Sequence, residues 1–122
     1  MDLNNSGTAI KACQDTHKWV QENYNFGYTE TADILSDLQD EINELHTELH
    51  TGDKDRIASE IGDIAFVLCN LANKYGVCLE TALEKSTAEY QQRLAYIREK
   101  IGHENMCREK ITELWADAKN RA

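Results

Sequence analysis

Apolar side chains recur at helical spacing in two consecutive stretches of this 122-residue sequence, and this pattern constrains the fold more than any other feature. The first stripe, within 31–50, is Ile34, Leu38, Ile42, Leu45 and Leu49. The second, within 54–75, is Ile57, Ile61, Ile64, Leu68, Leu71 and Tyr75. Each stripe occupies one face of an α-helix. Because only a short connection containing Gly52 separates them, we expect two helices packed antiparallel.

The rest of the chain also has helical character, since it contains no proline and only six glycines. Helices are predicted at about 8–24, 31–50, 54–75, 79–101 and 104–119. The helix at 54–75 should be the most buried, because apolar residues cover much of its circumference. We predict an all-α fold: an antiparallel bundle of about five helices, completed by oligomerisation. It forms one domain spanning 1–122, with its core at about 8–101.

Short polar residues mark where these helices should begin. Ser6 is the expected cap of the first, Thr29 or Thr31 of the second, and Asp53 or Asp55 of the third. Glycines mark the ends, at Gly52, Gly76 and Gly102.

The negative charge of the chain is concentrated between 33 and 63. This stretch has ten acidic residues and two basic ones, Lys54 and Arg56, whereas the rest has twelve acids and eleven bases. On the predicted second helix the acids lie roughly 100° from the apolar stripe, and therefore flank the packed seam. Acids three and four residues apart repel each other, so we expect a positive partner to offset them.

Two short motifs in this stretch have the spacing of a metal site. They are Glu41-x-x-Glu44 and Glu60-x-x-Asp63, and fifteen residues separate them. Carboxylates three residues apart on a helix point the same way. On adjacent antiparallel helices the four would surround one small volume. Such an all-oxygen, anionic set suits Mg²⁺, with Mn²⁺ as a possible substitute, better than zinc or copper. A surface-exposed, solvated set of acids is the alternative.

Several other classes of site and location are disfavoured. No histidine follows a Glu by three residues, as di-iron bundles require, and no phosphate-binding glycine loop is present. A net charge of −9 disfavours nucleic acid and anionic membranes. No apolar run reaches the length of a membrane span, no signal pattern opens the chain, and its four scattered cysteines suggest reduced thiols. We expect a cytoplasmic protein.

Two side chains on the first predicted helix have open interpretations. His17 lies on the apolar stripe of this helix, with Ile10, Cys13 and Val20. At such a place a hydrogen-bonded core histidine is favoured over a metal or substrate ligand. Trp19 lies off that stripe. It either covers a neighbouring element or chain, or forms the wall of a site for a flat ligand.

The residues Asp40-Glu41-x-x-Glu44, Glu60-x-Gly62-Asp63, Asn70, Ala72, Gly76-Val77 and Ala82-Leu83 resemble the MazG-like nucleotide pyrophosphohydrolases of the all-α NTP pyrophosphatase superfamily. The resemblance covers roughly 35–97. It implies a helical, oligomeric, Mg²⁺-dependent enzyme that cleaves nucleoside triphosphates to monophosphates and pyrophosphate, plausibly to clear unwanted nucleotides.

By that resemblance, Glu41, Glu44, Glu60 and Asp63 are both the metal ligands and the catalytic residues. Glu41 or a neighbouring acid would also position the attacking water. Asn70, Lys74 and Arg93 are candidate substrate contacts, together with Trp19 as the candidate wall of the site.

The predicted fourth helix departs from the family pattern. Where members often carry an Asn and a Lys-Phe step followed by Arg, this chain has Thr87, Glu89-Tyr90 and Arg93. Cys78 stands where a capping residue such as Asp is usual. The contacts to base and phosphate are therefore expected to differ from those of typical members.

A homodimer or homotetramer acting on a nucleoside triphosphate, without nucleic acid or membrane partners, is the predicted assembly. The alternative is a non-catalytic, acidic helical interaction module. A third possibility is a related substrate such as a phosphoribosyl-linked nucleotide.

Overall fold

The computed structural model describes residues 8–24, 30–101 and 107–120. These residues form five helices and no strand, so the all-α prediction is confirmed for this part of the chain. The helices are α1 (Ala9–Tyr24), α2 (Thr31–Thr51), α3 (Lys54–Lys74), α4 (Leu79–Ile101) and α5 (Arg108–Asn120). All but the start of α5 agree with the predicted bounds to within one residue. Oligomerisation stays a prediction.

The helix starts were predicted less well than the ends. Thr8 caps α1 by accepting a hydrogen bond from the backbone N–H of Lys11, whereas Ser6 lies outside the described residues. Thr31 does not cap α2: it is the first helical residue, and its hydroxyl bonds to the hydroxyl of Tyr75, the residue that follows α3, at 2.6 Å. Thr29 and residues 104–106 also lie outside the described part, and Cys107 precedes α5.

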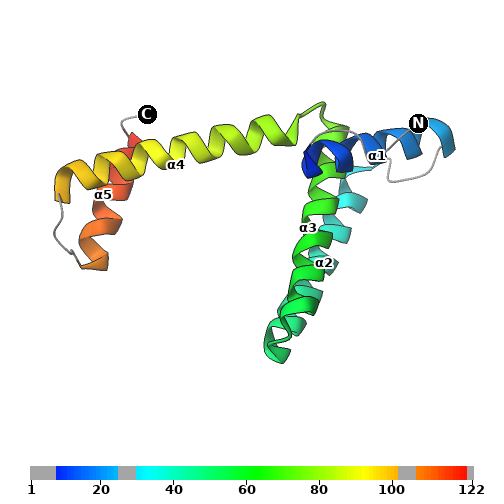
Figure 1. The fold of residues 1–122 in the computed structure, drawn as a ribbon, viewed down its shortest axis with the longest axis horizontal. Helices are drawn as coiled ribbons and strands as arrows, with labels where there is room; N and C mark the ends of the chain where they lie inside the picture. Colours follow the sequence, from blue (N-terminus) through cyan, green and yellow to red (C-terminus); the bar gives the residue numbers. More distant parts are fainter. Residues whose placement is uncertain (1–7, 25–29, 102–106, 121–122) are drawn as a thin grey trace. The chain divides into compact units, whose positions relative to one another are not determined.

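A tight antiparallel hairpin joins α2 and α3, which lie side by side in Figure 1. Gly52 ends α2 with φ of 69°, a left-handed conformation that only glycine adopts without strain. Asp53 then caps α3, because its carboxylate accepts hydrogen bonds from the N–H groups of Asp55 and Arg56. Gly76, with φ of 67°, follows the end of α3. The predicted stops at Gly52 and Gly76 and the Asp53 cap are confirmed, whereas Gly102, the third predicted stop, lies outside the described residues.

Helix α1 packs on α3 through a polar connection that the sequence did not reveal. The side-chain amide of Gln14 donates to Asn73 and to the carbonyl of Val77, each at 2.9 Å. Its oxygen accepts from the N–H of Leu79, the first residue of α4. Asn73 in turn donates to the backbone carbonyl of Gln14. One glutamine therefore attaches α1 to the end of α3 and caps α4 from a distance.

Helix α3 has more buried residues than any other described helix, as predicted. Val67, Cys69 and Ala72 are buried there, and Ile34 of α2 is fully buried. Much of both predicted stripes is nevertheless exposed. On α2, Ile42 and Leu49 of the stripe and Leu35 beside it are exposed and recur every seven residues. Ile61 and Leu68 on α3, and Tyr75 directly after it, are exposed with the same spacing. These exposed side chains form a second apolar face of the hairpin.

The chain divides into two compact units, Met1–Glu80 and Thr81–Ala122, so the prediction of one domain stays a prediction. In the second unit, Ile97 and Ala118 are buried. The rings of Tyr90 and Trp115 pack with centroids 4.8 Å apart, and the Tyr96 hydroxyl donates to Asp117. None of the described helices is both long and apolar enough to cross a membrane.

Replacing Gly52 with alanine should destabilise the hairpin by about 1–2 kcal/mol, the cost of a left-handed backbone for a residue with a Cβ. Gly62→Ala is the matched control, since it lies inside α3 and neither glycine has an atom within 4 Å of an added Cβ. The unfolding free energy of the control variant should rise by up to about 1 kcal/mol, because alanine has a higher helix propensity than glycine. Urea unfolding measures both, and a Gly52→Ala variant as stable as wild type would contradict the assignment of this turn.

Candidate metal centre

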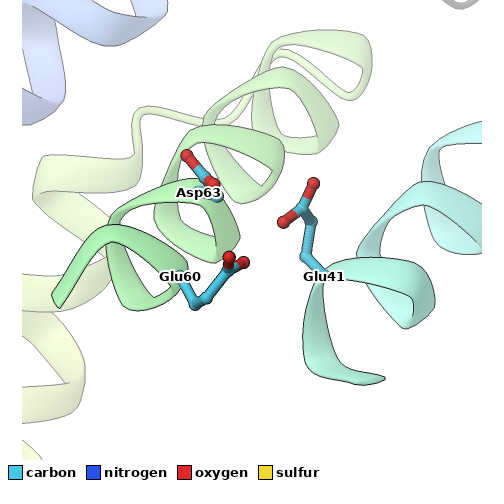
Figure 2. A group of neighbouring side chains, drawn as sticks. All are labelled: Glu41, Glu60 and Asp63. Atoms are coloured by element: carbon cyan, nitrogen blue, oxygen red, sulfur yellow. The ribbon is translucent and has the colours of Figure 1, made fainter. Parts of the chain in front are cut away.

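Three carboxylates from the facing helices of the hairpin meet in one place. Glu41 extends from α2 toward α3, which carries Glu60 and Asp63 one turn apart (Figure 2). One oxygen of each lies within 4.8 Å of the others. The antiparallel turn at Gly52 brings the two sequence motifs together in this way, since it folds α3 back along α2.

The carboxylates of Glu41 and Glu60 are partly removed from water, and each has one oxygen without a hydrogen-bond partner among the described residues. Both side chains are half-buried, whereas Asp63 is exposed. The Oε2 atoms of Glu41 and Glu60 are buried and accept no hydrogen bond. A buried acceptor without a partner costs free energy, and a charged one costs more. These two oxygens therefore indicate a site that is incomplete without a cation or a proton.

The electrostatics of the cluster agree with this geometry. Loss of hydration, followed by the proximity of Glu44 and Asp63, raises the pKa of Glu41 from its usual 4.5 to about 7. Burial, again followed by the effects of Glu44 and Asp63, also raises the pKa of Glu60. Glu44 is thus close enough to influence both groups, although it is exposed and is not one of the three carboxylates that converge within 4.8 Å.

The donor set fits a hard divalent cation. It offers only carboxylate oxygens, from two helices held by a rigid turn, with Glu44 adjacent. Mg²⁺ and Mn²⁺ prefer such oxygen ligands and keep several waters, so a partly open cluster suits them. A bound cation would favour the charged forms of the carboxylates and so reverse the rise in their pKa values.

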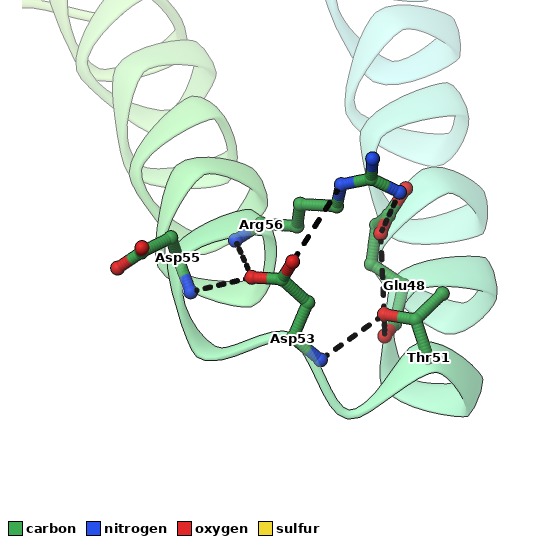
Figure 3. Close-up of polar contacts among 5 residues, drawn as sticks. All are labelled: Glu48, Thr51, Asp53, Asp55 and Arg56. Carbon is green, nitrogen blue, oxygen red and sulfur yellow. Dashed lines mark hydrogen bonds and ion pairs between the residues drawn. The ribbon is translucent and has the colours of Figure 1, made fainter.

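A positive partner for the acidic edge lies near the turn (Figure 3). Arg56 reaches from α3 toward Glu48 on α2, with Nη1 4.0 Å from the carboxylate. Its Nε lies 3.8 Å from Asp53. Thr51 supports the turn as well, because its hydroxyl donates to the Glu48 carbonyl and accepts from the N–H of Asp53. A positive partner for these acids was predicted from the sequence, but no motif there marks Arg56 as functional.

The other predicted site residues have separate surroundings. Trp19, on α1, is half-buried and packs edge-to-face against Tyr24, with centroids 5.2 Å apart. Asn70 is half-buried on α3, seven residues beyond Asp63, and Lys74 is exposed in the last turn of that helix. Arg93 belongs to the second unit, where its guanidinium carbon lies 5.8 Å from the centre of the Trp115 ring.

His17 has the environment of a structural histidine. Its Nε2 lies 3.0 Å from the carbonyl oxygen of Phe66, and its ring packs on the Phe66 ring with centroids 4.2 Å apart. Burial lowers its pKa, so the neutral form is favoured. These contacts explain the histidine on the apolar stripe of α1 without a ligand.

The α2–α3 hairpin of this all-helical chain brings three carboxylates together in an arrangement that could hold a divalent cation. The model of the MazG nucleotide pyrophosphohydrolase domain matches residues 29–97, which include all four motif acids and more than half of the chain. The chain therefore belongs to the MazG nucleotide pyrophosphohydrolase family. A comparison with curated proteins found no match.

The raised pKa of Glu41 predicts a measurable pH effect in metal-free protein. An acid with a higher pKa in the folded chain binds its proton more tightly when folded, so its contribution lowers stability as pH rises from 4.5 to about 7. Glu41→Gln should remove this contribution. We expect the stability of the variant relative to wild type to increase across that range, measured by urea unfolding in EDTA. Asp40→Asn, on the exposed neighbour, is the control; equal pH profiles for wild type and Glu41→Gln would contradict the cluster's geometry.

Proposed function

We propose that this protein is a Mg²⁺-dependent nucleoside triphosphate pyrophosphohydrolase, which converts (d)NTP to (d)NMP and pyrophosphate. The observation that carries the proposal is the convergence of Glu41, Glu60 and Asp63, with two buried, unpartnered oxygens, inside the segment that matches the family. A role in clearing unwanted nucleotides in the cytoplasm follows the same resemblance.

In this proposal the carboxylates hold and orient the reacting groups. Glu41, Glu60 and Asp63 would bind the cation, and Glu44 would be its fourth ligand. When bound, Mg²⁺ supplies charge neutralisation at the phosphate oxygens and lowers the pKa of coordinated water. Glu41 or its neighbour Glu44 accepts a hydrogen bond from the attacking water and directs it in line at the α-phosphorus.

The substrate contacts we propose are Asn70 and Lys74 on α3, Trp19 on α1, and Arg93. Asn70 continues the helix face of Asp63, and its amide can bond to a base, a sugar or a phosphate. Trp19 offers a flat apolar surface for a base. Arg93 offers a fork of donors for phosphate, and its Nε is buried without a hydrogen-bond partner.

We also propose that the protein is a homodimer or a tetramer of dimers. The support is the second apolar face of the α2–α3 hairpin, which consists of Leu35, Ile42, Leu49, Ile61, Leu68 and Tyr75. A seven-residue repeat on both helices is the pattern with which helices pack against other helices. Two copies of the hairpin would cover each other's faces in a four-helix arrangement.

A second candidate function is a non-catalytic acidic module that binds a basic partner. The concentration of acids between 33 and 63 favours it, independently of any metal. The two functions differ in their response to cations. Specific metal binding to the folded state should raise the melting temperature, since Mg²⁺ at 100 times its Kd stabilises by about 2.7 kcal/mol. A module whose acids are only solvated should show no such rise.

Purified protein should release pyrophosphate from members of a dNTP panel in the presence of Mg²⁺. Glu60→Gln and Asp63→Asn should each lower the rate by about 100-fold or more, because each removes a charge that orients the reacting phosphate. Both variants should also lose the Mg²⁺-dependent rise in melting temperature.

Asp55→Asn is the matched control, since it removes an acid from the first turn of the same helix, outside the cluster. Its rate should stay close to wild type. Full activity in folded Glu60→Gln and Asp63→Asn would exclude this site, and a wild-type protein inactive on every dNTP would exclude the proposed reaction.

Replacing Ile42 and Ile61 together with glutamine should reduce the mass of the assembly, because both lie on the exposed apolar face. Analytical ultracentrifugation measures the effect. Val77→Gln, at a similarly exposed residue beyond α3, should leave the mass unchanged. A wild-type protein that sediments as a monomer would contradict the proposed dimer.

A further inference from the structure

We propose that Arg56 binds the terminal phosphates of the substrate and so fixes the direction in which the triphosphate lies along the α2–α3 hairpin. The inference rests on the proposed function, because it assigns a further residue to the same site. It also gives the substrate an orientation: phosphate tail toward the turn at Gly52, nucleoside toward the other end of α3.

Arg56 occupies the same face of α3 as the metal-site acids. It precedes Glu60 by four residues, which is about 40° around the helix and about 6 Å along it. Its partner Glu48 follows Glu44 by four residues on α2, and therefore continues the acidic line of that helix in the same direction. The carboxylate cluster and the Arg56 guanidinium thus form two successive levels of one inter-helix edge. The distance between them is one that a chain of phosphates can span.

The present partners of Arg56 hold it in position without saturating it. The separations of 4.0 Å from Glu48 and 3.8 Å from Asp53 are long for ion pairs, and 66% of the Arg56 side chain is exposed. Exposed ion pairs of this kind contribute little to stability, so replacing a carboxylate partner of Arg56 with a phosphate costs little free energy. The guanidinium fork also matches phosphate oxygens in a bidentate arrangement. Arg56 is therefore accessible and close to the required position.

Charge makes this residue stand out. Between 33 and 63 the chain has only two bases, and the cluster's surroundings are otherwise acidic. A triphosphate approaching this edge is repelled everywhere except at the cation and at a base beside it. Lys54 is the other base, but it precedes Glu60 by six residues and so lies about 120° away around α3. Only Arg56 lies in line with the cluster.

The orientation agrees with the remaining candidates on α3. Asn70 and Lys74 follow Asp63, whereas Arg56 precedes Glu60, so they lie on opposite sides of the cluster along the helix. With the α-phosphorus at the carboxylates and the terminal phosphates at Arg56, the sugar and base extend toward Asn70. Pyrophosphate, the proposed leaving group, would then depart from the turn end of the hairpin.

Steady-state kinetics on a hydrolysed dNTP test the assignment, together with inhibition by inorganic pyrophosphate in Mg²⁺. Arg56→Gln should raise KM and the inhibition constant of pyrophosphate about tenfold each, the effect of losing one charged hydrogen bond. Arg56→Lys should recover part of both, because it keeps the charge but not the fork. The Arg56→Gln variant should bind dNMP as wild type does, since the monophosphate lacks the terminal phosphates.

Lys54→Gln is the matched control, with the same loss of charge in the same helical turn, and should change neither constant by more than about twofold. Three results would overturn the assignment: wild-type constants in Arg56→Gln, equal losses in Lys54→Gln, or a weakening that includes dNMP to the same extent. Melting temperatures distinguish a purely structural role. If Arg56 only stabilised the turn, Arg56→Gln would lower the melting temperature and leave KM and the inhibition constant unchanged. An inactive wild-type protein would overturn this inference with the proposed function, whereas an active one with an unaffected Arg56→Gln variant overturns this inference alone.

Discussion

Hydrophobic packing of α2 against α3 forces like charges together, and the rest of the site depends on this opposition. The buried side chain of Ile34 and those of Val67, Cys69 and Ala72 hold the unit that contains the hairpin. The packing of the two helices keeps the backbones of the acids beside the seam close together. Glu41 and Glu60 consequently keep oxygens that are buried and lack a hydrogen-bond partner. Such local strain is expected where function has been built at the expense of stability.

The fold was predictable because its signals are local. Periodicity located all five helices, and glycine located the stops at Gly52 and Gly76, since a left-handed residue at the end of a helix needs no tertiary context. The helix starts depended on side-chain choices that the fold decides. Thr31 was a plausible cap by type, but Tyr75, 44 residues away, takes its hydroxyl. Gln14 performs a capping role for α4 that no local pattern marks, because its partners lie 59 to 65 residues along the chain.

The site was predictable to the level of residue pairs and no further. Helical spacing puts Glu41 beside Glu44, and Glu60 beside Asp63, but spacing leaves open which oxygens converge. That choice depends on the register of the hairpin and on rotamers, and it brings Glu41, Glu60 and Asp63 together with Glu44 alongside. Periodicity likewise predicts an apolar face without saying what covers it. Leu35, Ile42 and Leu49 satisfy the same helical pattern as buried residues, yet they are exposed in the single chain.

The charge of the chain also constrains how a polyphosphate could bind. The acidic stretch repels a triphosphate, so the cation must be present before the phosphates can approach the carboxylates. In the proposed reaction the same field would also act on the products, and it would favour departure of the more highly charged fragment, pyrophosphate. A base held loosely by Glu48 and Asp53 can accept that fragment and then return to its carboxylate partners. The long ion pairs at the turn are therefore consistent with binding that is oriented but not tight. A tightly saturated arginine would hold the hairpin more firmly, but it would have no donors left for phosphate.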